Sequence, residues 1–194
     1  TDWRGNNNIA ESILGQLERE PHPQPAWIVC GAGTGGTSAT IGRYLRYRGL
    51  DTRLCVAEPA GGGFAQGWRS RDPAASASRP TLIEGIGRAK VEPGFLFDVV
   101  DAVVEVEDAD SIAATWLLEE RFGRRYGGSS GTNFVACLEL ASAMRARGET
   151  GSIATLLCDR GERYAETLFD RDWLANHGID PEPGRARLSA RLRD

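Results

Sequence analysis

Lysine and histidine are scarce in this 194-residue chain, which limits the chemistry that its side chains can perform. Lys90 is the only lysine, although arginine is abundant, so any reaction that needs a reactive lysine has one candidate here. The two histidines, His22 and His177, have no metal-ligand or nucleophile set beside them in the sequence. Zinc chemistry and a Ser-His-Asp arrangement are therefore not indicated, and the sequence predicts no metal site.

Long apolar runs, an excess of charge and paired cysteines are missing as well. No stretch is long and apolar enough to cross a membrane, and the polar start at residues 1–6 is unlike a signal peptide, so we expect a cytoplasmic protein. The net charge of −4 gives no reason to expect nucleic acid or an anionic membrane as a partner. The cysteines show no CxxC spacing and sit among apolar residues, which predicts four small buried side chains: Cys30, Cys55, Cys137 and Cys158.

What the chain does have is a glycine-rich stretch between a short apolar run and a helical pattern. Residues 27–31 are apolar and partly β-branched, as in a central parallel strand, and residues 38–45 continue as a helix that stops near Gly49. Between them, glycines permit a sharp turn, and the free amides of a helix start suit a phosphate group. We therefore predict a phosphate-binding turn formed by Gly33, Thr34, Gly35, Gly36 and Thr37.

Two kinds of cofactor could use such a turn, and a strand-to-helix turn without a ligand is a third possibility. The spacing Gly31-x-Gly33-x-x-Gly36, with Glu58 after a second apparent strand, satisfies a dinucleotide fingerprint. In that case Glu58 would bind a ribose. The denser form at residues 33–37 is also typical of a pyridoxal-phosphate loop, so the decision depends on the rest of the chain.

The remaining pattern predicts an α/β fold with a mostly parallel, twisted sheet flanked by helices. We expect strands over residues 27–31, 52–58, 98–106 and 153–159, and helices over 6–20 with an asparagine cap, 111–120, 134–147 and around 165–169. Residues 59–80 are rich in glycine, proline and small side chains, which favours a long surface loop. The arginine-dotted end, residues 184–194, is expected to be solvated or frayed.

Four short motifs follow one another along the chain: Gly33-Thr34-Gly35-Gly36-Thr37, Glu84-Gly85-Ile86-Gly87, Gly128-Ser129-Ser130-Gly131 and Asp159-Arg160-Gly161-Glu162-Arg163-Tyr164. In this order they resemble the cysteine synthase and cystathionine β-synthase family of fold-type-II pyridoxal-phosphate enzymes. Each motif is weak alone, but the order and spacing favour this family over a dinucleotide-binding protein, which gives no reason for the third motif.

The resemblance implies a cofactor, pyridoxal 5'-phosphate, and roles for the first three motifs. Residues 33–37 would hold its phosphate, and Ser129 matches the family serine that meets the pyridine nitrogen. Glu84, Gly85, Ile86 and Gly87 match a segment that lines the substrate entrance. The resemblance further implies a small amino-acid substrate, either cysteine or O-acetylserine, and a homodimer. The expected activity is a cysteine desulfhydrase, which releases sulfide, or a cysteine synthase.

The chain departs from the family in lacking the N-terminal segment that carries the Schiff-base lysine. Lys90 follows the entrance motif and is in the wrong place, so we assign no catalytic residue in this chain. Residues 1–194 are therefore expected to be the larger, cofactor-binding α/β domain of a longer enzyme, inactive alone. A dinucleotide-binding oxidoreductase domain and a lysine-less, non-catalytic homologue remain alternatives.

Overall fold

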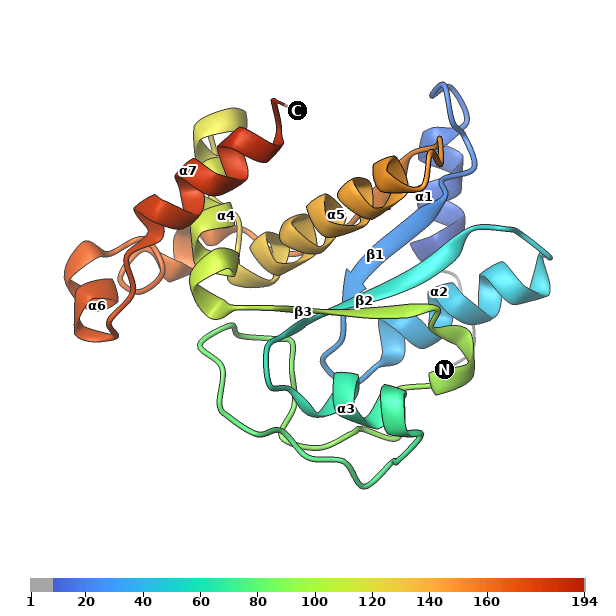
Figure 1. Ribbon diagram of the computed structural model, residues 1–194, viewed down its shortest axis with the longest axis horizontal. Helices are drawn as coiled ribbons and strands as arrows, with labels where there is room; N and C mark the ends of the chain where they lie inside the picture. The colour runs from blue at the N-terminus through green and yellow to red at the C-terminus, as the bar shows by residue number, and fades with distance from the viewer. Residues whose placement is uncertain (1–8, 194) are drawn as a thin grey trace.

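The computed structural model describes residues 9–193 and shows a four-stranded sheet with helices on both faces (Figure 1). The strands lie in the order β3-β2-β1-β4, and every pairing is parallel. Their bounds are Trp27–Gly31 for β1, Arg53–Pro59 for β2, Ala102–Val106 for β3 and Ile153–Thr155 for β4. The predicted α/β fold with a mostly parallel sheet is confirmed.

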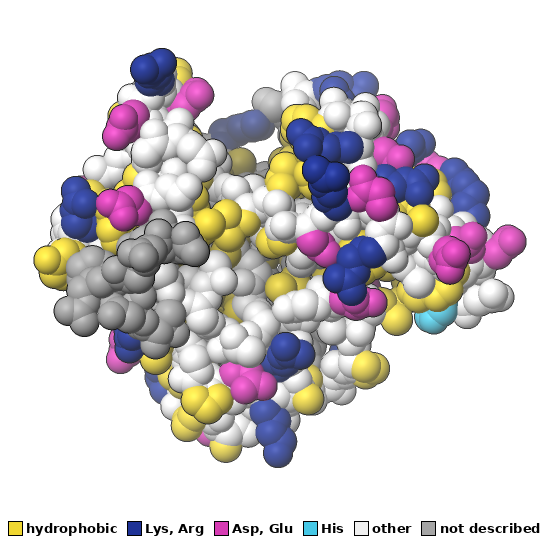
Figure 2. All heavy atoms as spheres, turned by 180° about the vertical axis from the view of Figure 1, so that it is seen from behind, with side chains coloured by type: hydrophobic (Ala, Val, Ile, Leu, Met, Phe, Trp, Pro, Cys, Tyr) yellow, Lys and Arg dark blue, Asp and Glu magenta, His cyan; other side chains and the backbone are white. Residues whose placement is uncertain are grey.

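Seven α-helices lie in the described residues, and none of them has both the length and the apolar composition that a membrane crossing requires. They are α1 (Ile9–Leu17), α2 (Gly36–Tyr47), α3 (Gly63–Ser70), α4 (Asp108–Phe122), α5 (Gly128–Ala146), α6 (Arg171–Asn176) and α7 (Pro181–Arg191). Two short 3-10 helices, η1 (Phe97–Val99) and η2 (Gly161–Tyr164), complete the set. On the face shown in Figure 2, basic and acidic side chains lie beside one another.

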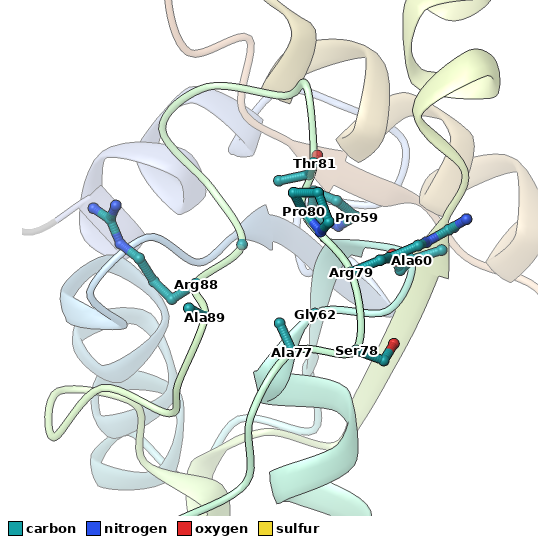
Figure 3. Close-up of a pocket in the computed structure, with 11 residues that line it drawn as sticks. Pro59, Ala60, Gly62, Ala77, Ser78, Arg79, Pro80, Thr81, Arg88 and Ala89 are labelled. Carbon is teal, nitrogen blue, oxygen red and sulfur yellow. The ribbon is translucent and has the colours of Figure 1, made fainter.

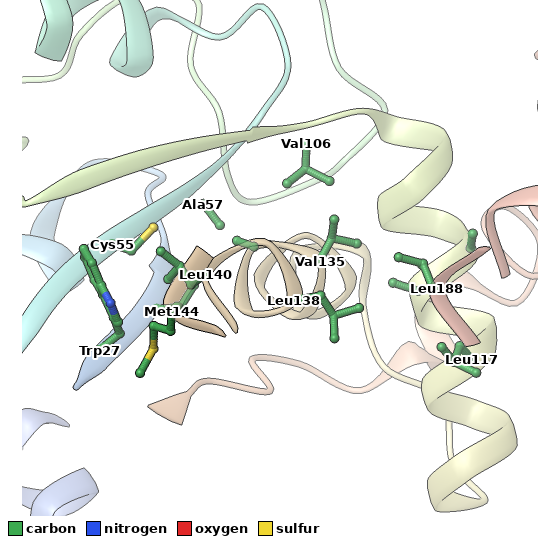
Figure 4. Close-up of a cluster of buried hydrophobic side chains, with 14 residues drawn as sticks. Trp27, Cys55, Ala57, Val106, Leu117, Val135, Leu138, Leu140, Met144 and Leu188 are labelled. Atoms are coloured by element: carbon green, nitrogen blue, oxygen red, sulfur yellow. The ribbon is translucent and has the colours of Figure 1, made fainter. Parts of the chain in front are cut away.

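The sheet is buried on both faces, which explains its nearly continuous apolar strands. Successive side chains of a strand point to opposite faces, so Trp27 and Val29 belong to a cluster that lies against α5. Figure 4 shows that this cluster continues along α5 to Leu117 of α4 and Leu188 of α7. Ile28 and Cys30 point the other way, into a second cluster with α1, α2 and α3. A third cluster contains Ile83, Ile86, Tyr164 and Leu174 and so joins the segment after α3 to the segment after β4.

The predicted surface loop at residues 59–80 is wrong in part, because it contains helix α3. The Glu58 carboxylate is buried and accepts hydrogen bonds from the backbone amides of Phe64 (3.0 Å) and Ala65 (2.6 Å). This side chain therefore satisfies the free amides at the start of α3 from outside the helix. Because Glu58 lies on the preceding strand, residues 59–80 contain no capping residue that would have predicted helix α3.

Other boundaries differ by a few residues. Helix α5 begins at Gly128 and not at Phe134, so the predicted glycine–hydroxyl turn is the first part of the helix. The strands predicted over 98–106 and 153–159 are shorter, at Ala102–Val106 and Ile153–Thr155. The first predicted helix is present as Ile9–Leu17, and its asparagine cap lies outside the described residues.

The C-terminal segment is folded, contrary to the prediction of a frayed end. Helix α7 packs on α4, and Leu188 is only 2% exposed. Gly184 lies so close to Ala113 that a side chain at 184 would come within 2.7 Å of the Ala113 methyl group. Arg187 pairs with Asp110, and Arg191 pairs with Glu139 at 2.5 Å. Because arginine is frequent in this segment, the sequence pattern did not show the few apolar positions that decide its packing.

Candidate functional site

The predicted site residues gather at the carboxyl ends of β1 and β4. The chain passes from β1 to β2 on one side, whereas β4 pairs with β1 on the other, so the strand order reverses at this point. Loops that follow two such strands diverge and leave a crevice between them, which is where open α/β sheets bind ligands. The glycine turn follows β1, and the segment 156–159 follows β4.

A cavity of about 390 Å³ fills this crevice and brings together residues that are far apart in the sequence. Six of the predicted site residues line it: Gly33, Thr37, Glu84, Gly85, Ile86 and Ser129. The other lining residues are Gly31, Leu156, Cys158, Asp159, Arg163 and Tyr164. The cavity therefore joins the glycine turn, the entrance segment and the start of α5 in one place.

The glycines of the turn differ in how much space surrounds them, and so in why a side chain is excluded there. A Cβ on Gly33 would lie 2.5 Å from the Gly85 carbonyl oxygen, and a Cβ on Gly35 would lie 2.4 Å from the Phe95 amide nitrogen. Gly35 also has a φ of 82°, a left-handed conformation that favours glycine. These two glycines are needed for backbone packing. A Cβ on Gly36 would meet only Thr34 Oγ1, at 3.8 Å, so this position borders open space that a ligand can fill.

The open space continues into an adjoining cavity of about 620 Å³ at the start of α2. Thr34, Gly36 and Thr37 line it, and Thr37 borders both cavities. The first amides of a helix have no acceptor within the helix, and the helix dipole adds positive potential there. The junction at Thr37 is therefore suited to an anionic group, with hydroxyls from two threonines beside it.

Two neighbouring serines at the start of α5 have different environments. Ser130 is fully buried, and its Oγ accepts a hydrogen bond of 3.0 Å from the Cys158 amide. Ser129 is 7% exposed and lines the cavity. Ser130 thus fastens the segment after β4 to α5, whereas Ser129 presents a hydroxyl to the cavity.

The entrance segment is held against the glycine turn but is divided between two cavities. The Gly87 amide donates to the Ala32 carbonyl oxygen at 2.9 Å, and Ile86 lies against Gly31. Glu84, Gly85 and Ile86 face the cavity with Ser129, but Gly87 lines a separate one of about 380 Å³. In that second cavity the Arg79 and Arg88 side chains extend away from the centre in opposite directions, leaving mostly small and apolar groups around it (Figure 3).

Three lining residues after β4 were given no role on the basis of the sequence. Tyr164 donates a hydrogen bond of 2.9 Å to Asp159 Oδ2, and burial together with this carboxylate raises the pKa of Tyr164 to about 12. Asp159 Oδ1 is buried and has no hydrogen-bond partner. Arg163 pairs with Glu84 at the rim, at 3.2 Å. The motif at residues 159–164 was the available signal, but only the fold shows which side it faces.

The cysteine prediction is correct for Cys30 and Cys55, which are buried, and wrong for Cys158, which is exposed. Cys137 is half-buried. An apolar neighbourhood in sequence did not separate these cases, because Leu157 and Cys158 follow β4 into the loop instead of continuing the strand. Cys158 consequently lies at the border of the two adjoining cavities.

Glu58 is not available to a ribose, which removes the main support for a dinucleotide site. Its carboxylate is 1% exposed and is engaged with the amides of α3. Burial raises its pKa to about 7, partly offset by these two hydrogen bonds. The acidic residue at the expected spacing is therefore a structural cap.

Lys90 does not line the cavity. It is exposed and forms an isolated β-bridge with Ser76. Within residues 9–193, no group of three or more His, Cys, Asp or Glu side chains is placed to hold a metal ion. The cavity instead offers backbone amides, hydroxyls and a few charged groups.

Comparison with known proteins gives a consistent result. A family model described as "Pyridoxal-phosphate dependent enzyme" matches residues 1–159. The L-cysteine desulfhydrase Cds1 of Mycobacterium tuberculosis is 51% identical over 188 residues, which is 97% of this chain and 51% of that protein. Cysteine synthase 2 of Schizosaccharomyces pombe is 30% identical over 171 residues, or 80% of this chain and 41% of that protein.

Two solved structures share the fold. A hydrogen sulfide-producing enzyme (Fn1055) from Fusobacterium nucleatum matches with a TM-score of 0.70 and 26% identity, over 90% of this chain and 49% of that one. An O-acetylserine-dependent cystathionine β-synthase from Helicobacter pylori matches with a TM-score of 0.66 and 29% identity, over 82% and 47%. The chain thus spans about half the length of these relatives.

Proposed function

This chain belongs to the family of pyridoxal-phosphate-dependent enzymes, and we propose that the cavity beside Ser129 is its cofactor site. The observation that carries the proposal is the junction at Thr37, where the start of α2 borders the same cavity as Ser129. The space next to Gly36 is open to a phosphate, because a Cβ at this position would meet only Thr34 Oγ1, at 3.8 Å. A pyridine ring between the glycine turn and α5 would then reach the Ser129 hydroxyl.

Each end of the cavity has a distinct task in this proposal. Residues 33–37 bind the phosphate through helix amides and the hydroxyls of Thr34 and Thr37. Ser129 orients the ring from the opposite end. Bound pyridoxal phosphate supplies an electron sink for the substrate carbanion. Since Ser129 is a neutral hydroxyl, it does not favour a protonated ring as a carboxylate would, which moderates that sink and suits loss of a β-substituent.

The substrate we propose is L-cysteine, in a longer protein that contains this chain. β-Elimination breaks the Cα–H and Cβ–S bonds and releases hydrogen sulfide, and hydrolysis of the remaining fragment gives pyruvate and ammonia. Similarity to a cysteine desulfhydrase over nearly the whole chain favours this reaction. Formation of cysteine from O-acetylserine and sulfide is the second candidate, favoured by the similarity to cysteine synthases, since both reactions begin with loss of a β-substituent.

The chain itself supplies cofactor binding and not the reactive amine. No lysine lines the cavity, so we assign residues 1–194 to the larger cofactor-binding domain and the Schiff-base lysine to a part of the protein outside this chain. We further propose that the longer protein acts as a cytoplasmic homodimer, on the basis of the family resemblance. Light scattering of that protein at graded concentrations tests the dimer.

Titration of the chain with pyridoxal phosphate tests the site. We expect saturable quenching of intrinsic fluorescence, weaker binding of pyridoxal, which lacks the phosphate, and no stabilisation by NAD. Stabilisation by NAD without an effect of pyridoxal phosphate contradicts the proposal.

Two serine variants of the longer enzyme separate ring contact from structure. Ser129→Ala is expected to keep the cofactor but to lower the rate of sulfide release by about tenfold or more. Ser130→Ala is the matched control, because it removes the acceptor of the Cys158 amide. Its main expected effect is a lower stability of the fold and not a lower rate of sulfide release. Equal loss of cofactor in both variants means that Ser129 is only a structural residue.

A further inference from the structure

Glu84 and Arg163 meet across the mouth of the cavity, from segments 79 residues apart in the sequence. The Arg163 guanidinium donates a hydrogen bond of 3.2 Å to Glu84 Oε2. Both residues line the cavity that contains Ser129, and the family match ends at residue 159, before Arg163. From this arrangement we propose that Glu84 and Arg163 form a reception site for the zwitterion of an α-amino acid. The proposal rests on the proposed function, whose substrate it would admit.

The backbones that carry the two charges are fixed. Ile83, next to Glu84, is 2% exposed, and Tyr164, next to Arg163, is 6% exposed; both belong to the third hydrophobic cluster. Gly161, at the start of η2, donates its amide to the Arg125 carbonyl oxygen at 3.0 Å. The spacing of the two attachment points is therefore set by the core and not by the ion pair.

The charged heads, in contrast, are free to exchange partners. The side chains of Arg163 and Glu84 are 65% and 61% exposed, so water screens their attraction. An exposed pair of this kind contributes little to stability, and its replacement by contacts with a ligand costs little. Arg163 also lies over the Tyr164 ring, with its guanidinium carbon 5.1 Å from the ring centroid, which keeps the head near the mouth when Glu84 is released.

The signs of the charges select the class of ligand. Among the described residues that line the cavity, Arg163 is the only cation, while Glu84 and Asp159 are acidic. A simple anion would gain Arg163 but would meet two carboxylates. An α-amino acid offers its carboxylate to Arg163 and its ammonium group to Glu84, so both charges of the pair are satisfied at once. The same orientation holds the amino group at the mouth of the cofactor cavity.

Binding of L-alanine tests the proposal, since alanine has no β-substituent to lose. Saturation-transfer NMR on the 194-residue chain is expected to detect alanine, but neither propionate nor ethylamine at the same concentration. Arg163→Gln and Glu84→Gln are each expected to weaken alanine binding by about fivefold. Arg160→Gln and Glu162→Gln remove the same charges nearby, at exposed positions that do not line the cavity, and are expected to leave binding unchanged.

The outcomes separate this proposal from the cofactor assignment. If Arg163→Gln binds alanine as well as Arg160→Gln does, or if the unmodified chain binds no alanine, the reception site is wrong even when pyridoxal phosphate binds. If alanine binding depends on Arg163 and Glu84 while pyridoxal phosphate does not bind, the reception site holds and the cofactor site is wrong. Propionate binding as strong as that of alanine overturns the zwitterion in favour of a plain anion site.

Discussion

The Tyr164 hydroxyl donates a hydrogen bond of 2.9 Å to Oδ2 of Asp159, while Oδ1 of the same carboxylate is buried without a hydrogen-bond partner. The Tyr164 hydroxyl thus satisfies one oxygen of Asp159, at the wall of the candidate cofactor cavity. Its backbone carbonyl accepts from the Gly127 amide at 3.1 Å, so the pair also lies against the start of α5. The hydrogen bond between the Asp159 carboxylate and the Tyr164 hydroxyl therefore helps to fix residues 159–164 beside the start of α5, where Ser129 lies.

Tyr164→Phe is expected to destabilise the chain by about 1–3 kcal/mol, because it leaves both oxygens of a partly buried carboxylate unsatisfied. Urea unfolding measures this change. Adding Asp159→Asn to the variant is expected to recover part of the loss, since a neutral amide is less costly to bury. A Tyr164→Phe effect below about 0.5 kcal/mol would show that water already satisfies Asp159.

Glu58 makes a pH dependence predictable. Folding raises its pKa from the ordinary 4.5 to about 7, chiefly through burial, so the folded chain holds the proton more tightly than the unfolded chain does. Its contribution to stability is fully present below pH 4.5 and is lost as the pH rises through about 7. Glu58→Gln, which stays neutral, is expected to remove this part of the decline.

Thermal unfolding at several pH values between 5 and 8 checks the prediction. The expected loss of unfolding free energy from one such group is on the order of 1–3 kcal/mol. The quantity of interest is the slope of stability against pH in the parent chain minus that in the variant. Parallel curves for the two proteins would mean that Glu58 is ionised in the folded chain throughout this range.

Two adjacent glycines are expected to respond differently to alanine. Gly35→Ala forces a Cβ to within 2.4 Å of the Phe95 amide at a φ of 82°, and a loss of about 2 kcal/mol or more is expected. Gly36→Ala places its methyl group in open space at the first position of α2, so stability is expected to stay within about 0.5 kcal/mol.

The affinity for pyridoxal phosphate is expected to show what the Gly36→Ala variant loses although its stability is kept. Because the methyl group at Gly36→Ala enters the space proposed for the phosphate, the affinity for pyridoxal phosphate is expected to fall although the fold is intact. Denaturant unfolding and a pyridoxal-phosphate titration on the same samples decide the matter. Unchanged affinity in Gly36→Ala would place the phosphate elsewhere.

Helix α7 is expected to be part of the cooperative core. Leu188→Ala empties a buried position against α4 and should cost about 2–5 kcal/mol, whereas Leu192→Ala, at a position that is 42% exposed, should cost little. A single unfolding transition with a lower midpoint in Leu188→Ala supports this view. Equal midpoints in the two variants would show that α7 does not contribute.

Sequence patterns were sufficient where local chemistry and burial agree. The apolar run at 27–31 and the glycine turn after it identify a buried strand that feeds a helix, because both features are local. The same reasoning failed for α3 and α7, whose stability comes from Glu58 and from packing on α4, respectively. These partners are distant in the sequence or hidden among polar residues, so a residue-by-residue pattern could not contain them.

The candidate site was likewise predictable only where the information is local in the sequence. Motif order predicted site residues that include Gly33, Thr37, Glu84 and Ser129, and the fold brings these four to one cavity. It did not show that Gly87 faces a different cavity, nor that Cys158 and Arg163 face this one. Which side a loop residue faces depends on how the loop is anchored, as the Gly87 amide is to Ala32, and such anchors are tertiary contacts.

In the proposed reception site, the third hydrophobic cluster gives the C-terminal part of the chain an influence on ligand choice. Leu168 and Leu174 pack with Ile83 and Tyr164, whose neighbours Glu84 and Arg163 stand on either side of the opening. A change of volume at these two leucines would alter how far apart the opposing charges stand. Divergence in residues 165–179 is thus a route by which related enzymes could acquire new preferences while every group that touches the ligand stays the same.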